Sequence, residues 1–195
     1  MKRREALKNI GLTLGYTAIV PSALSILQSC TNNEKKWTPV FFTEEESIVI
    51  KKLVDLILPK TEATPGALDV NVPEFLDVYA SKAYNEEDMA KYKKGIESIV
   101  DALPVSESGV KDLKTEDYTA LLNKYLRATK TIETQFKKEN NLVYKSLSNL
   151  RNQAVWAFTT SETIGKNILA YDPIPAIQKG CISVDEATGG KAWSL

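Results

Sequence analysis

The sequence contains no histidine among its 195 residues. Histidine is the most common transition-metal ligand and the usual general base near neutral pH. Its absence excludes haem ligated through histidine, most catalytic zinc sites, and nucleophiles activated by a Ser–His or Cys–His pair. Asp69, Glu74 and Asp77 do not have the alternating ligand pattern of an EF-hand calcium loop either. We therefore predict no catalytic, metal-binding or cofactor-binding residues in this chain.

Cysteine is scarce as well, with Cys30 and Cys181 as the two examples. Leu27-Gln28-Ser29-Cys30 resembles a lipobox, in which a lipid is attached to the cysteine and the chain is cut before it. Cys181 would then have no disulfide partner, and without a histidine to activate it we expect a buried structural thiol. A disulfide between the two cysteines is the alternative, which requires that Cys30 carry no lipid.

A basic face is missing from the body of the chain. The formal net charge is zero, but residues 1–29 hold four basic residues and one acidic residue, a net +3 that leaves −3 in the remainder. Nucleic-acid binding needs a basic surface that displaces counterions. We therefore expect no nucleic-acid partner.

The first thirty residues are typical of an export signal. Arg3, Arg4 and Leu7 lie in RREALK, which resembles a twin-arginine motif, the signal of a route that carries folded proteins. The stretch from Ile10 to Leu27 is apolar but interrupted by Pro21 and by several glycine, serine and threonine residues, so it is weaker than a membrane span. We predict a lipoprotein signal peptide over 1–29, a lipidated Cys30, a tether over 30–42 and a membrane-anchored periplasmic location. An uncleaved N-terminal anchor helix is the alternative.

Helical patterns dominate the rest, which we predict to be a single helical domain over 43–195. Thr43 and Glu46 form a predicted capping box before an apolar stripe that Pro59 ends, and Pro73 opens the next helix with Phe75, Leu76, Tyr79 and Ala83 facing inward. Further helices are expected over 86–103, from Thr115 past Phe136, and over 143–168. The sequence predicts an all-α fold: an irregular bundle of about five helices with a long loop and an extended C-terminal tail.

Two irregular segments interrupt this pattern: the loop 60–72, with Pro65-Gly66, and the tail 169–195. Loops as long as this one are uncommon in compact domains and are often functional. Trp193 lies close to the chain end, where a large aromatic side chain either packs into its own core or anchors in a partner. The sequence leaves both possibilities open.

Residues 54–77 and 157–195 resemble the gluconate 2-dehydrogenase subunit 3 family. The most specific short motifs are Leu-Pro at 58–59, TPGA at 64–67, VPEF at 72–75, YDP at 171–173, Gly-Cys at 180–181 and Ala-Trp at 192–193. Because these motifs lie in turns and loops, helical composition alone does not produce them. The resemblance extends over nearly all of the mature chain.

The resemblance implies an accessory small subunit of a membrane-associated sugar or polyol dehydrogenase. In this family the large subunit is a flavoprotein of the glucose–methanol–choline oxidoreductase class, in some members joined by a cytochrome c. The FAD and the haem c belong to those other chains. The small subunit commonly carries the twin-arginine signal that the flavoprotein lacks, which would explain why a chain without cofactor ligands uses this route.

Two functions follow from these observations. In the first, the chain is a non-catalytic subunit that escorts a folded FAD-dependent dehydrogenase through export and anchors it to the membrane. Its candidate partner-interface residues are Pro65, Gly66, Tyr171, Asp172, Pro173 and Trp193. In the second, it is a stand-alone periplasmic lipoprotein that binds a sugar or a cell-wall component, for which an open, aromatic-lined pocket would be the signature.

Overall fold

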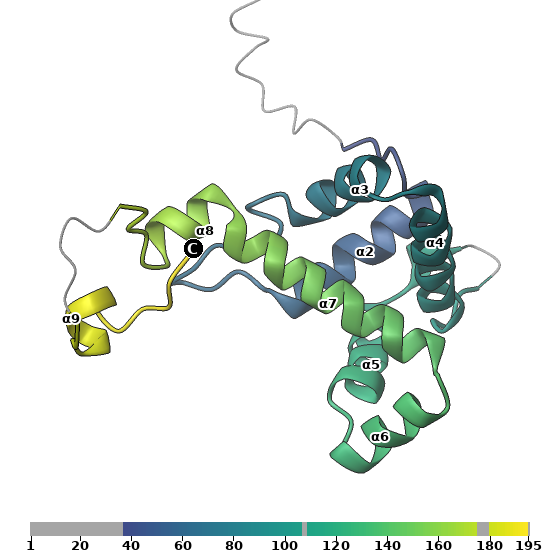
Figure 1. Ribbon diagram of the computed structural model, residues 1–195. Helices are drawn as coiled ribbons and strands as arrows, with labels where there is room; N and C mark the ends of the chain where they lie inside the picture. The colour runs from purple at the N-terminus through teal and green to yellow at the C-terminus, as the bar shows by residue number, and fades with distance from the viewer. Residues whose placement is uncertain (1–36, 107–108, 175–179, 195) are drawn as a thin grey trace, which may run out of the picture. The chain divides into compact units, whose positions relative to one another are not determined.

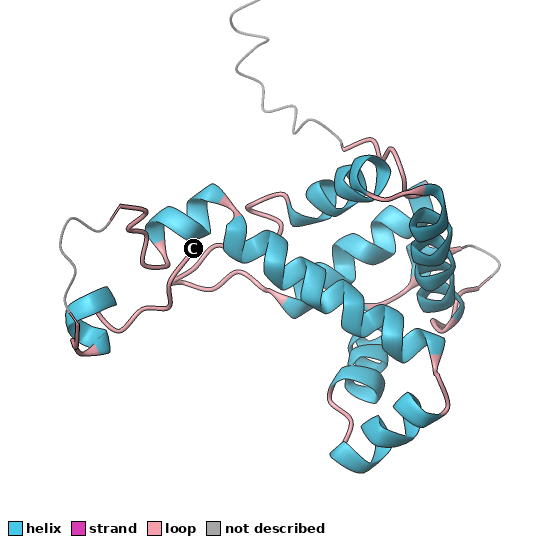
Figure 2. Cartoon of the chain, in the orientation of Figure 1, coloured by secondary structure: helices cyan, strands magenta, loops and turns pink. Residues whose placement is uncertain are grey.

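The computed structural model of the protein describes residues 37–106, 109–174 and 180–194 (Figure 1). These residues form eight α-helices and one short 3-10 helix, and no strand (Figure 2). The all-α prediction is confirmed. Residues Thr38–Leu195 form one compact unit. The predicted export residues Arg3, Arg4 and Leu7 and the predicted lipidation site Cys30 lie outside the described residues.

The helix α2 (Glu44–Ile57) begins as the sequence predicts. The Thr43 side chain accepts a hydrogen bond from the Glu46 N–H, and the Glu46 carboxylate accepts one from the Thr43 N–H at 2.7 Å. These two bonds satisfy N–H groups that a helix start leaves free. The predicted apolar stripe is fully buried at Val49, Ile50, Leu53 and Val54.

Two helices follow the long loop. Helix α3 (Val72–Ala83) has Pro73 in its first turn, as predicted, and α4 (Glu86–Asp101) is capped by Asn85. Helix α4 ends two residues before the predicted end at Leu103, because the chain must leave the helical conformation before Pro104. The 3-10 helix η1 (Val110–Asp112) follows α4 in the chain.

The long helix predicted from Thr115 is wrong, because the chain forms α5 (Thr115–Leu126) and α6 (Lys130–Lys138) instead. The turn between them places Phe136 5.2 Å from the Tyr125 ring and 5.6 Å from the Tyr144 ring, measured between centroids. One straight helix would hold Phe136 far from Tyr125, at 1.5 Å per residue. Aromatic packing therefore overrides local helical preference here.

The last predicted helix is also divided, into α7 (Leu142–Thr160) and α8 (Glu162–Asn167). The hydroxyls of Thr159, Thr160 and Ser161 all donate to backbone carbonyls of the preceding turn. Such bonds compete with the helical pattern and help to end it. A short helix, α9 (Val184–Thr188), lies in the tail, where the sequence indicated none.

The core forms around α7, which packs against α4, α3 and α5, while α2 packs against α3, α4, α5 and η1 (Figure 1). Leu147, Leu150 and Ala154 of α7 are fully buried. Gly95 allows α4 to approach α7, since a Cβ there would lie 2.7 Å from the Ser146 hydroxyl oxygen. Two residues predicted to face inward, Phe75 and Ala83, are exposed.

Candidate functional site

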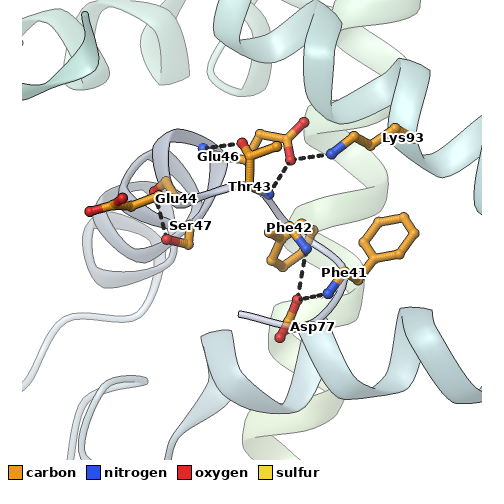
Figure 3. A network of polar contacts seen from close by, with 8 residues as sticks. All are labelled: Phe41, Phe42, Thr43, Glu44, Glu46, Ser47, Asp77 and Lys93. Carbon is orange, nitrogen blue, oxygen red and sulfur yellow. Dashed lines mark hydrogen bonds and ion pairs between the residues drawn. The ribbon is translucent and has the colours of Figure 1, made fainter. Parts of the chain in front are cut away.

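The start of the helical body is held by one buried carboxylate. Asp77 on α3 is fully buried and accepts hydrogen bonds from Phe41 N–H at 2.8 Å and Phe42 N–H at 2.9 Å (Figure 3). It accepts a third backbone hydrogen bond from Val40 N–H at 2.7 Å. Hydrogen bonds to an ionised carboxylate are stronger than those between neutral groups. Residues 40–42, the last three of the predicted tether, are therefore fastened to α3.

A second polar contact joins the same segment to α4. The Glu46 carboxylate, 7% exposed, accepts a 2.5 Å hydrogen bond from the Lys93 ammonium group, which also lies 5.7 Å from the centre of the Phe41 ring (Figure 3). The capping box of α2 is thus part of an ion pair with α4. Sequence reasoning found the capping box but not its partner, because Lys93 lies 47 positions further along the chain.

The loop between α2 and α3 is tightly hydrogen-bonded within itself. The Ala67 N–H donates to the Leu58 carbonyl at 2.9 Å, and the Asp69 carboxylate accepts from the Gly66 N–H and from Lys60. These two donors lower the pKa of the Asp69 carboxyl, Gly66 contributing most. A Cβ at Gly66 would lie 2.6 Å from the backbone nitrogen of Lys60. The TPGA motif therefore stabilises the conformation of the loop itself. The interface role of Pro65 and Gly66 stays a prediction.

In the described part of the C-terminal tail, two backbone hydrogen bonds join its first residues to its last ones. The Ala170 N–H donates to the Ala192 carbonyl at 2.9 Å, and the Ser194 N–H donates to the Ala170 carbonyl at 3.0 Å. Helix α9 has no buried residue. Exposed tail residues include the predicted interface residues Tyr171, Asp172, Pro173 and Trp193, as well as Ile174, Ile182 and Val184.

Trp193 and Cys181 are both exposed in the tail. Trp193 is 51% exposed, so it is not packed into the core, which was one of the two possibilities for this residue. The buried thiol expected at Cys181 is wrong, because Cys181 is exposed. It lies in a stretch where every described residue from 180 to 186 is exposed and no apolar surface covers the side chain.

A line of aromatic rings crosses α3 and α7. The Phe75 ring lies 5.4 Å from Trp156 and 5.7 Å from Tyr79, and Tyr79 contacts both Trp156 and Tyr84. Phe75 and Trp156 are 41% and 43% exposed. Sequence reasoning missed this surface by assigning Phe75 to the core. A sequence signal was present, since α3 has apolar residues at 75, 76, 78 and 79, more than one buried stripe can hold.

A groove of about 490 Å³ lies beside these rings, between α3 and α7. It is lined chiefly by Val70, Glu74, Phe75, Val78, Ala157 and Thr160, and we call it the α3–α7 groove. Val78 is 49% exposed. Glu74 Oε2 is buried and has no hydrogen-bond partner among the described residues. Asn71 and Ser161 complete the lining, so the groove combines apolar side chains with hydroxyl and amide groups and one carboxylate.

A second hollow, of about 350 Å³, lies between α4 and α7. Its lining includes Tyr84, Asp88, Tyr92, Ser146 and Asn149. Burial raises the pKa of Tyr92 and of Tyr84, and a hydrogen bond from the Gln153 amide to the Tyr84 hydroxyl partly offsets the rise for Tyr84. Two aromatic rings with hydroxyl, amide and carboxylate groups could contact a small polyhydroxylated molecule.

No group of three or more metal-ligating acidic or cysteine side chains occurs in the part of the chain that the structure describes. Asp77, Asp69 and Glu46 instead accept hydrogen bonds from backbone N–H groups, and the latter two also from lysine side chains. Among the helices of the described residues, none is long and apolar enough to cross a membrane.

Comparison with known proteins gives one match. Residues 44–176 match the family model described as Gluconate 2-dehydrogenase subunit 3, a range that runs from the first residue of α2 to beyond α8. Searches of curated proteins and of solved structures found no match to this chain. The matched range contains Asp77, the loop between α2 and α3, and the α3–α7 groove, but not residues 40–42, whose N–H groups donate to Asp77.

Proposed function

Because the chain belongs to the gluconate 2-dehydrogenase subunit 3 family, we propose that it is the non-catalytic small subunit of an exported FAD-dependent sugar or polyol dehydrogenase. The large subunit would be a flavoprotein of the glucose–methanol–choline class, which in some members of the family is joined by a cytochrome c that carries haem c. The family match over residues 44–176 carries this proposal. The absence of histidine from the sequence supports a division of labour in which the large subunit supplies the chemistry.

Export and anchoring form the second part of the proposal. Arg3, Arg4 and Leu7 direct the folded pair of subunits through twin-arginine export, and lipidated Cys30 holds it at the membrane on the periplasmic side. The Asp77 carboxylate bears on this role, because it fastens residues 40–42 to the helical body. A pull on the tether would then be transmitted to α3 through three charge-assisted hydrogen bonds.

The tail is proposed as part of the interface with the flavoprotein. Large apolar side chains are exposed along the tail. Burying them against a partner would remove apolar surface from water, which is favourable by roughly 25 cal/mol per Å² of that surface. Trp193, at 51% exposure, is of the residue type that most often dominates the energy of an interface. The loop of residues 60–72 is a weaker candidate, since its turns already have internal structural roles.

Co-purification tests the subunit assignment. The full chain and the flavin-containing large subunit are produced together, and recovery of flavoprotein is compared for the intact chain, a chain truncated after Leu169, and Trp193→Ala. We expect both tail variants to recover less flavoprotein. Ile132→Ala, an exposed apolar residue of α6, is the control and should behave as the intact chain. Equal recovery from all four would refute the role of the tail.

Two signal variants separate export from anchoring. Replacing Arg3 and Arg4 by lysine should leave the flavoprotein in the cytoplasm, whereas Cys30→Ser should export it but release it from the membrane fraction. Cys181→Ser is the matched control, and it should change neither location. Normal export of the flavoprotein with the two lysines would refute the escort role while leaving the subunit role standing.

The hollow between α4 and α7 favours the alternative function, a stand-alone lipoprotein that binds a sugar or a cell-wall component. Tyr84, Tyr92, Asp88 and Asn149 are the groups that would contact such a ligand. Calorimetric titration of the chain alone with monosaccharides and with muropeptides tests this function. Measurable affinity that Asn149→Ala weakens, in a chain that recovers no flavoprotein, would replace our first proposal with this one.

A further inference from the structure

Glu74, which lines the α3–α7 groove, has a carboxylate oxygen without a hydrogen-bond donor in the described part of the chain. Glu74 Oε2 has almost no contact with solvent and has no hydrogen-bond partner among the described side chains and backbone groups. A buried acceptor that loses water without gaining a donor destabilises the state it is in. A carboxylate oxygen forms its shortest and strongest hydrogen bonds with charged donors. Glu74 also lines the α3–α7 groove, so a cationic donor that binds in the groove can pair with its carboxylate.

The residues around Glu74 favour arginine over lysine as the cationic donor. Phe75 and Trp156 form an exposed edge-to-face pair, with centroids 5.4 Å apart, and Phe75 is itself part of the groove lining. An arginine guanidinium can stack on an aromatic face while it forks onto a carboxylate, whereas a lysine ammonium is a point charge without a planar face. Val78, at 49% exposure, and Val70 add an apolar wall that suits an aliphatic side chain.

We propose that the α3–α7 groove docks a segment of the dehydrogenase large subunit in which an arginine pairs with Glu74 beside an apolar side chain that contacts Val78. This inference rests on the proposed function, because it takes the large subunit as the occupant. A second copy of this chain is a poorer fit. A twofold contact through the groove would bring two Glu74 carboxylates together and supply neither with a donor.

Binding of the large subunit to Glu74→Gln and Val78→Ser tests the proposal. We expect each variant to weaken the Kd by about tenfold or more, which is typical for losing one partner of a desolvated charge pair or a central apolar contact. Glu97→Gln and Leu142→Ser, at exposed positions on α4 and α7, are the matched controls and should bind as the unmodified chain does. Thermal unfolding of Glu74→Gln alone should occur at the temperature of the unmodified chain or above it, since a neutral amide replaces a carboxylate that has one buried oxygen without a donor among the described residues.

A photo-crosslinking residue at position 78 then identifies the occupant directly. The expected product joins this chain to a large-subunit peptide that contains arginine, and reversing that arginine to glutamate should be rescued by Glu74→Arg. A crosslink to a second copy, to residues 1–36 of this chain, or to a peptide without arginine would overturn the inference. If the unmodified chain binds while both groove variants bind equally well, the groove assignment fails and the proposed function stands. If the unmodified chain does not bind the large subunit, both fail.

Discussion

Asp77 and Phe42 lie 35 positions apart in the chain, yet the Phe42 N–H donates a 2.9 Å hydrogen bond to Asp77 Oδ1, and both residues are buried. The same oxygen accepts from Phe41, and the other carboxylate oxygen accepts from Val40. A carboxylate with three N–H donors is well compensated for its burial. The contact therefore fastens the first described residues to α3, and it can be tested by removing the carboxylate.

Asp77→Ala should destabilise the chain by about 3 kcal/mol, because it leaves three N–H groups without their acceptor in a partly dry environment. Asp77→Asn keeps one carbonyl oxygen and should cost less, about 1–2 kcal/mol. Urea unfolding measures both changes. Asp101→Ala, an exposed acidic residue at the end of α4, should stay within about 0.5 kcal/mol of the unmodified chain. If Asp77→Ala changed the stability as little as Asp101→Ala, Asp77 would not be what fastens residues 40–42 to α3.

Lys93→Met should lower the free energy of unfolding by about 1–2 kcal/mol, because the Glu46 carboxylate, 7% exposed, would lose its cation. Lys91→Met is a control on the same helix. Lys91 pairs with Glu87 at 2.6 Å, but both side chains are well exposed, so the loss should be below about 0.5 kcal/mol. Equal losses in urea unfolding would mean that burial does not strengthen the Glu46 pair.

Gly66→Ala should destabilise the chain by about 1–3 kcal/mol, since the added Cβ would press on the Lys60 backbone, which cannot rotate away as a side chain can. Gly180→Ala, where a Cβ meets nothing within 4 Å, is the control and should be close to neutral. Thermal unfolding of the chain without partner measures both. An undisturbed Gly66→Ala chain that binds flavoprotein poorly would instead assign Gly66 to the interface.

Alkaline pH should destabilise the fold. Burial raises the pKa of the Tyr92, Tyr84 and Tyr118 hydroxyls above the ordinary value of 10.0. Above that pH the unfolded chain loses phenolic protons that the folded chain still holds, so stability present below pH 10 is lost as the pH rises. Unfolding free energies on both sides of pH 10, with tyrosinate absorbance as the probe, measure this effect.

Tyr92→Phe isolates the largest contribution to this alkaline loss. It keeps the ring that contacts Phe41, Phe42 and Tyr84 and removes the buried hydroxyl, which has no partner among the described residues. We expect a smaller loss of stability above pH 10 and no loss at pH 7. An unchanged alkaline profile would assign the pH dependence to other groups.

Sequence reasoning reached the local features of the candidate site but not its surfaces. The capping box at Thr43, the helix start at Pro73 and the irregular tail follow from neighbouring residues, and the structure confirms the first two. The α3–α7 groove and the ion pair of Glu46 with Lys93 join residues far apart in the chain. No local pattern marks such pairs, and an apolar residue such as Phe75 looks the same in sequence whether it faces the core or solvent.

The amino-acid sequence by itself determined the all-α class, the ends of α2 and the start of α3, since capping groups, proline and apolar periodicity act within a few residues. It also determined the family, through turn motifs that are independent of helical composition. Only the tertiary structure decided where the long helical patterns break, because Phe136 contacts both Tyr125 and Tyr144 only if α5 and α6 are separate. It likewise decided which apolar residues stay exposed, since burial depends on what packs against each face and not on the residue itself.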